Sequence, residues 1–69
     1  MKRKLGTRVK ILGGMSEFVG KTGEIVDYDP RDRLYRVELD EPVLIPGIGA
    51  VTDDLWGGEY LKTLRGGGR

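Results

Sequence analysis

The side chains that this sequence lacks limit the chemistry that it can perform. Its 69 residues include no Cys and no His, which excludes thiolate and imidazole metal sites and every catalytic arrangement built on Cys or His. Ser16 is the sole serine, and no histidine is present to activate it. Asp53 and Asp54 are adjacent, so in an extended chain their carboxylates point to opposite faces and cannot act as an acid–base pair. We therefore predict that the chain is not an enzyme.

Three carboxylates have part of the spacing of a calcium-binding loop. Asp27, Asp29 and Glu38 match positions 1, 3 and 12 of a calcium-binding loop. Arg31, however, stands where a ligand is needed, and Asp32 stands where a glycine must turn. The sequence therefore predicts no metal site, and we expect no cofactor and no small-molecule substrate.

The basic residues gather at the two ends of the chain. Residues 1–10 hold five bases and no acid, residues 62–69 hold three bases and no acid, and the middle holds the other four bases with all eleven acids. The net charge of +1 is therefore +8 at the ends and −7 between them. If the terminal strands are neighbours, these bases form one surface that can bind phosphate groups. The alternative is that they only keep the ends soluble. The predicted nucleic-acid-binding residues are Lys4, Arg8, Lys10, Lys21, Lys62 and Arg65.

Apolar residues indicate a second kind of surface. The hairpin from Val43 to Val51 carries more large apolar side chains than one side of a small hairpin can bury. Trp56 is either an exposed anchor or a core residue, and Phe18 either contacts a partner or closes one end of the fold. The alternative function is therefore a protein-interaction or structural module, including a homo-oligomer. Its predicted contact residues are Met15, Phe18, Leu44, Ile48 and Trp56.

The elements that position these residues read as short strands. Glycine clusters separate segments of alternating polarity, and no window has helical apolar spacing. We predict an all-β fold, a small SH3-like barrel of five to six short antiparallel strands with its first and last strands side by side. Residues 1–6 are expected to be a flexible basic arm, 7–64 the barrel and 65–69 a flexible Gly/Arg tail. The predicted strands are 7–12, 22–28, 34–40, 43–45 with 48–51, and 60–64, and the predicted core is Val9, Ile11, Val19, Ile25, Tyr35, Val37, Leu39, Val51, Leu55, Leu61 and Leu64.

Two turns are predicted by their residue types. Asp29-Pro30-Arg31-Asp32 has the chemistry of a type I turn between the second and third strands. Pro46-Gly47 is the pair favoured at the centre of a type II turn, because glycine accepts positive φ there.

Three segments together resemble the KOW motif of SH3-like barrels. They are Gly6 to Gly13, Phe18-Val19-Gly20-Lys21-Thr22-Gly23-Glu24-Ile25-Val26 and Tyr35-Arg36-Val37-Glu38-Leu39, with Gly20 and Gly23 in the glycine places. The resemblance implies kinship with ribosomal proteins and transcription elongation factors, in which the loop often touches RNA or protein. It favours a non-enzymatic KOW-type module that contacts nucleic acid, or a nucleic-acid-bound complex, through its basic terminal face.

The chain is also similar to photosystem I subunit IV at Gly6 to Leu12, and loosely at Thr52 to Leu55 and Glu59 to Leu61. We interpret this likeness as a shared fold. Barrels of this size also occur among phage and plasmid proteins. Recognition of peptides in the manner of eukaryotic SH3 domains is not expected, because the loop holds Phe18 as its one aromatic residue.

Absent cysteine is typical of a reducing compartment. We find no targeting segment, and the longest apolar run, Val43 to Val51, is far shorter than the ~18 residues needed to span a bilayer. The sequence therefore predicts a cytoplasmic protein without a membrane partner.

Overall fold

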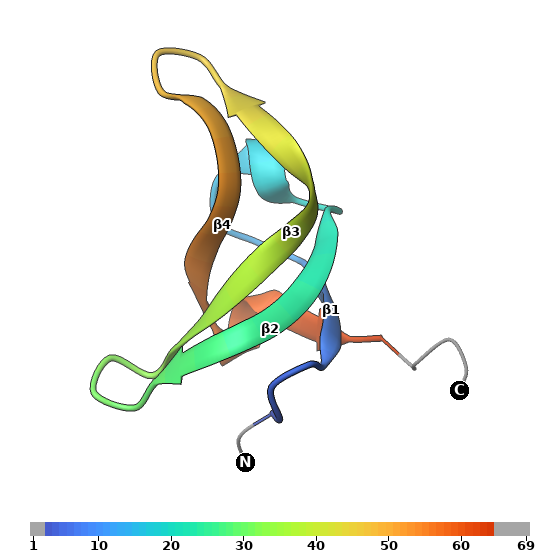
Figure 1. Ribbon diagram of the computed structural model, residues 1–69, viewed down its shortest axis with the longest axis vertical. Coiled ribbons are helices and arrows are strands. Elements are labelled where there is room, and N and C mark those ends of the chain that lie inside the picture. The colour runs from blue at the N-terminus through green and yellow to red at the C-terminus, as the bar shows by residue number, and fades with distance from the viewer. Residues whose placement is uncertain (1–2, 65–69) are drawn as a thin grey trace.

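The computed structural model describes residues 3–64, which form one five-stranded antiparallel sheet without an α-helix (Figure 1). This confirms the predicted all-β class. Residues 1–2 and the predicted tail at 65–69 lie outside the described residues. The strands are β1 (Arg8–Ile11), β2 (Thr22–Asp29), β3 (Leu34–Ile45), β4 (Gly49–Gly57) and β5 (Leu61–Thr63), joined in part by two single 3₁₀ turns, η1 (Ser16–Phe18) and η2 (Gly58–Tyr60).

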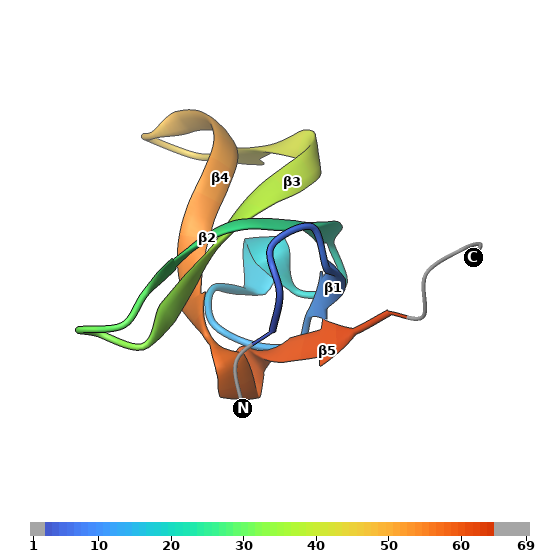
Figure 2. The same cartoon turned by 60° about the horizontal axis from the view of Figure 1, so that its bottom comes forward.

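The strands follow the order β4-β3-β2-β1-β5 across a strongly curled sheet (Figure 2). β1 pairs with both β2 and β5, so the first and last strands are neighbours as predicted. β4 and β5 each pair with a single strand and form the two edges of the sheet. Because the sheet curls, one face of every strand points inward to a common core.

The core is apolar, and the described residues bury no polar or charged side chain. Alternation places Tyr35, Val37 and Leu39 of β3 on the buried face, as the sequence predicts. The buried apolar residues are Val9, Ile11, Phe18, Ile25, Tyr35, Val37, Leu39, Val43, Ile45, Trp56 and Leu61.

Several core predictions were wrong. Val19 and Leu55 are exposed, while Val51 and Leu64 are half-buried. In their place the structure buries four residues: Phe18, Val43, Ile45 and Trp56. The reason at β4 is that a strand alternates its side chains, so turning Trp56 inward turns Leu55 outward. At η1 the 3₁₀ turn directs Phe18 inward and leaves Val19 exposed.

One long β3–β4 hairpin replaces the separate strand 34–40 and the small hairpin over 43–51 that the sequence predicts. β3 continues past Asp40 through Pro42, and the expected connector at 52–54 lies inside β4. Glu38 lies opposite Asp53, whereas Val43 lies opposite Val51, so residues 39–42 of β3 face Thr52 alone. This large bulge accommodates a proline, which cannot donate to a ladder. It also bends the hairpin so that β3 contacts η1 near the tip (Figure 1).

The chain turns at both predicted places, and the predicted type II turn is confirmed. In the β2–β3 loop the carboxylate of Asp29 accepts a hydrogen bond from the Arg31 backbone N–H at 2.9 Å, which is an Asx turn. At the hairpin tip Ile48 N–H donates to Ile45 C=O at 3.0 Å, and Gly47 has φ of +82°, as a type II turn requires.

Arg3, the first of the described residues, makes hydrogen bonds to the folded domain. Its backbone N–H donates to the Tyr35 hydroxyl at 2.9 Å. Its guanidinium donates to Thr63 Oγ1 at 2.7 Å and to the Leu61 carbonyl at 2.8 Å. Arg3 therefore joins the start of the described chain to β3 and β5.

Gly23 of β2 occupies a position where a side chain would not fit. A Cβ atom there would lie 2.8 Å from Val37 Cγ1 and closer still to the Glu38 backbone carbonyl. Gly23 is buried between its strand partners Val9 and Leu39, so neither neighbour can move away cheaply.

We expect Gly23→Ala to destabilise the domain by about 2 kcal/mol or more, because overpacking against backbone forces the sheet apart. Urea denaturation followed by Trp56 fluorescence measures the loss. Val26→Ala, on the same strand with an exposed side chain, is the control and should cost less than about 1 kcal/mol. Equal stabilities for the Gly23 variant and the native chain would contradict this packing.

Candidate binding surfaces

An apolar groove lies between the loop that contains η1 and the end of β4. Its volume is about 310 Å³. Met15, Leu55 and Tyr60 supply partly exposed walls, with exposed fractions of 49%, 37% and 44%. We call it the aromatic groove, and it is lined by Gly14, Met15, Phe18, Leu34, Asp54, Leu55, Trp56, Gly57 and Tyr60.

Phe18 and Trp56 form the floor of this groove. Their rings meet edge to face, with centroids 5.2 Å apart and planes at 79°. Phe18 is 2% exposed and Trp56 is 6% exposed, so each is the core residue that the sequence offered as the alternative to an exposed contact. The physical reason is that a domain of this size needs its largest rings in the core.

The Trp56 indole nevertheless keeps one polar group available. Nε1–H makes no hydrogen bond with any residue of the described range 3–64. No side-chain nitrogen or oxygen in that range is sealed from solvent without a partner, so Nε1 still reaches water. A buried indole usually finds an acceptor for this donor. Here the donor is open to water or to an acceptor from a bound partner.

Gly13 and Gly14 hold the loop close to the aromatic rings. A Cβ atom on Gly13 would lie 2.6 Å from Tyr60 Cδ1, and one on Gly14 would lie 3.3 Å from Trp56 Nε1. Gly14 also has φ of +94°, which side chains rarely adopt. The glycine pair therefore keeps the groove open between Tyr60 and Trp56.

The hairpin tip is a separate apolar surface. Leu44 and Ile48 are 76% and 72% exposed, the highest values among the large apolar residues described. Val43 and Ile45, on the other face of the same strand, are buried against the core. The excess of apolar residues noted in the sequence is thus divided: one face belongs to the core and the other is free.

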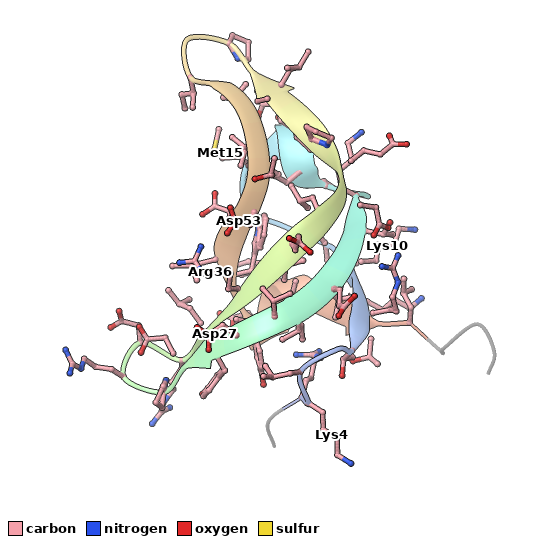
Figure 3. The ribbon with its side chains drawn as sticks, viewed as in Figure 1. Lys4, Lys10, Met15, Asp27, Arg36 and Asp53 are labelled. Carbon is pink, nitrogen blue, oxygen red and sulfur yellow. The ribbon has the colours of Figure 1, made fainter. Side chains whose placement is uncertain are left out.

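The predicted basic surface is only partly assembled. Lys10 of β1 lies directly opposite Lys62 of β5, and both side chains are exposed. Like charges facing each other across two strands repel, and neither lysine has an ion-pair partner within residues 3–64. Figure 3 shows Lys4 on a different part of the molecule from Lys10. Lys4 lies by a groove formed with Leu5, Tyr28 and Pro30, among others.

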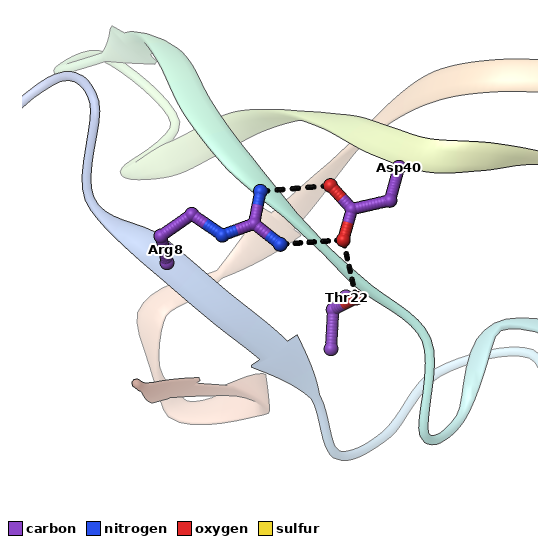
Figure 4. A network of polar contacts seen from close by, with 3 residues as sticks. All are labelled: Arg8, Thr22 and Asp40. Atoms are coloured by element: carbon purple, nitrogen blue, oxygen red, sulfur yellow. Dashed lines mark hydrogen bonds and ion pairs between the residues drawn. The ribbon is translucent and has the colours of Figure 1, made fainter. Parts of the chain in front are cut away.

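Arg8 is withdrawn from the basic surface by a carboxylate. Its guanidinium donates two hydrogen bonds to Asp40, one of them 2.7 Å long, and the Thr22 hydroxyl donates to the same carboxylate (Figure 4). These hydrogen bonds, first from Arg8 and then from Thr22, lower the pKa of Asp40 to about 2. The same contact raises the pKa of Arg8. Arg8 therefore acts as a cross-strand brace.

Lys21 does not extend the basic surface. Lys21 is exposed and lines a shallow hollow together with Asp40 and Glu41, so its surroundings are mixed in charge. Arg65 lies outside the described residues. Only Lys10 and Lys62 are thus brought together as an unpaired basic pair.

Acidic residues occupy the centre of the outer face. Glu24 of β2 lies opposite Glu38 of β3, which lies opposite Asp53 of β4. Arg36 partly offsets this row through a 2.9 Å ion pair with Asp53, and the two side chains are adjacent in Figure 3. The outer face therefore changes from basic at the β1–β5 edge to acidic over β2 to β4.

No family model, no curated protein and no solved structure matches this chain. Within residues 3–64 no group of acidic side chains is arranged to hold a metal ion. The same stretch contains no helix with the length and apolarity needed to cross a bilayer. The resemblances to KOW-type barrels and to photosystem I subunit IV stay predictions.

Tyr60 and Leu55 are groove residues that the sequence did not single out as contacts. Leu55 comes from β4 and Tyr60 from η2, and the fold brings both beside Trp56. The available signal was the spacing of Trp56 and Tyr60 around a glycine pair, which places two rings on either side of a tight turn.

Replacing Asp40 by Asn should make the free energy of unfolding depend less on pH below about pH 4. Because the Asp40 pKa is lowered in the folded state, its contribution is present above the ordinary value of 3.8 and is lost as the pH falls toward 2. The side chains of Arg8 and Asp40 are 41% and 39% exposed, so solvent weakens their ion pair. We therefore expect Asp40→Asn to lower the free energy of unfolding by at most about 1 kcal/mol at pH 7. Urea unfolding at pH 7 and pH 2.5 measures it.

At pH 2.5 the difference in stability between the native chain and Asp40→Asn should shrink to about a third of its value at pH 7, because a carboxyl with a pKa of about 2 is still partly ionised there. Asp32→Asn, which removes a carboxylate outside this network, controls for the general change in charge. A difference for Asp40→Asn that stays constant between the two pH values would show that the ion pair does not contribute.

Proposed function

We propose that this chain is a non-enzymatic binding module that holds an extended segment of a partner protein in the aromatic groove. The observation that carries the proposal is the Trp56 indole N–H, which has no partner within residues 3–64 and lies in a groove with apolar walls. An extended peptide presents a free carbonyl at each residue, and its side chains can pack on Met15, Leu55 and Tyr60.

The size of the groove supports a peptide rather than a cofactor. A volume of about 310 Å³ is at the lower limit of pockets that enclose small ligands, and this groove is open along the surface. It accommodates one or two aliphatic or proline side chains, with the backbone running over Trp56. Such a contact is a small, transient interface of the kind that peptide-recognition domains make.

Charge around the groove favours a basic segment. Asp54 lines the groove, and no basic residue does so. The Glu59 carboxylate also lies close by, since a Cβ atom on Gly57 would be 2.7 Å from it. A Lys or Arg beside the apolar residues of the partner would meet these carboxylates, which steers association and sets orientation.

A second candidate function, binding of nucleic acid, rests on the opposed pair Lys10 and Lys62. Two unpaired lysines directly across a strand pair cost stability, and a phosphate group placed between them would relieve the repulsion. The KOW resemblance implies the same partner. The acidic row over Glu24, Glu38 and Asp53 limits this contact to the β1–β5 edge.

Peptide binding is tested by selection from a phage-displayed random peptide library, followed by titration of a selected synthetic peptide. Trp56 is the one tryptophan of the chain, so its emission should shift as the groove fills. We expect Met15→Glu and Leu55→Glu each to weaken binding by about tenfold or more, the range of an interface hot spot.

Val19→Glu is the matched control, because Val19 lies in the same loop with an exposed fraction of 48% against 49% for Met15. It should bind as the native chain does. The proposal fails if no peptide is selected, or if Val19→Glu and Met15→Glu weaken binding equally.

Nucleic-acid binding is tested by titrating 20-nucleotide single strands and duplexes. With two lysines on phosphates, affinity should fall roughly tenfold between 50 and 200 mM salt. Lys62→Glu should abolish binding, whereas Arg31→Glu, with the same change in charge on the distant β2–β3 loop, should not. Equal losses for both variants would indicate a general charge effect and no site at the edge.

A further inference from the structure

The edge of β4 is the longest unpaired strand edge in residues 3–64. β4 spans nine residues and pairs with β3 alone, whereas the opposite edge strand, β5, spans three. No backbone hydrogen bond joins β4 to any described segment other than β3. Proteins usually protect such an edge with Lys, Pro or a bulge on the edge strand. β4 contains neither Lys nor Pro, and its charges, Asp53 and Asp54, lie in its second half.

The first half of β4 belongs to an uncharged stretch. From Pro42 to Thr52 no residue carries a charge, and this stretch forms the whole tip of the β3–β4 hairpin. The exposed side chains of Leu44 and Ile48 lie on the same tip. Leu44 is the cross-strand neighbour of Ala50, so an apolar row reaches the free edge.

We propose that two copies of this chain associate through antiparallel pairing of their β4 edges, with the Val51 residues of the two copies opposite each other. The sheet then continues as β3-β4-β4-β3 through a two-fold axis. Val51 already lies opposite Val43 within one copy, so the pairing creates a row of four valines across four strands. Rows of β-branched residues stabilise neighbouring strands.

The charges allow a second copy to pair in the register centred on Val51 and disfavour the registers centred on Thr52 and on Asp53. With Val51 opposite Val51, Asp53 of each copy lies opposite Gly49 of the other, and no like charges meet. A pairing centred on Thr52 would place Val51 opposite Asp53, and one centred on Asp53 would place the two carboxylates together, which is destabilising. The edge is therefore self-complementary in the register centred on Val51, as an isologous two-fold contact must be.

This association is independent of the proposed function. The aromatic groove lies at the Asp54 to Gly57 end of β4, beyond the paired residues 49–53. Dimerisation would leave both grooves open and would present two of them to a partner.

Sedimentation equilibrium between 10 µM and 1 mM tests the association directly. We expect a reversible monomer–dimer equilibrium for the native chain. Val51→Glu should be monomeric, since it places two carboxylates together, with circular dichroism and Trp56 emission as checks of folding. A strict monomer at 1 mM, or a dimer that persists in folded Val51→Glu, would overturn the proposal.

Single cysteines test the register, because the native chain has none. Val51→Cys, Asp53→Cys and the distant edge residue Lys62→Cys are oxidised separately, and this small apolar replacement at position 51 should not disturb folding. We expect position 51 to form a covalent dimer at least roughly tenfold faster than position 62, since disulfides need closely opposed Cβ atoms. Fastest reaction at position 53, or equal rates at all three, refutes the proposed pairing.

Discussion

The bend of β3 at residues 39–42 is the constraint on which the rest of the structure depends. Before the bend, β3 pairs with β2 and with the second half of β4; after it, β3 pairs with the first half of β4 at the hairpin tip. Without the extra residues the hairpin would continue straight away from the core, and Val43 and Ile45 would be exposed. With them, β3 reaches η1, and the loop that carries Phe18 is held against Trp56. One bulge thus completes the core.

Two ion pairs join neighbouring strands on the outer face of the sheet. Arg8 reaches across β2 to Asp40, and Arg36 reaches to Asp53, so two of the cations are used to hold acidic strands together. Among the basic residues of the five strands, Lys10 and Lys62 are the two that make no ion pair. The electrostatic asymmetry of the sequence survives in the fold, but on a much smaller area than the charges of the two ends suggest.

Strand positions were largely predictable, because alternation and glycine punctuation mark them locally. The β2–β3 hairpin, the β1–β5 pairing and the two turns all follow from such signals. The joining of strand 34–40 with the small hairpin at 43–51 did not follow from them, because Pro42 and the Asp53–Asp54 pair resemble breaks in a strand. The groove was missed for a related reason. Its walls come from three separate segments, and the contact between Phe18 and Trp56 that joins them is 38 residues apart in the sequence.

The Arg3 hydrogen bonds also make the two ends of the domain close neighbours. Its guanidinium holds the last strand at Thr63 and Leu61, and β1 runs alongside β5 for its whole short length. A short peptide linker between Leu64 and Arg3 would therefore close the chain into a ring at a small cost in loop entropy. The β2–β3 loop at 30–33, exposed and far from the tip, then offers a place for new termini. The fold would then be retained in a circularly permuted chain, because Arg3 and β5 already lie side by side.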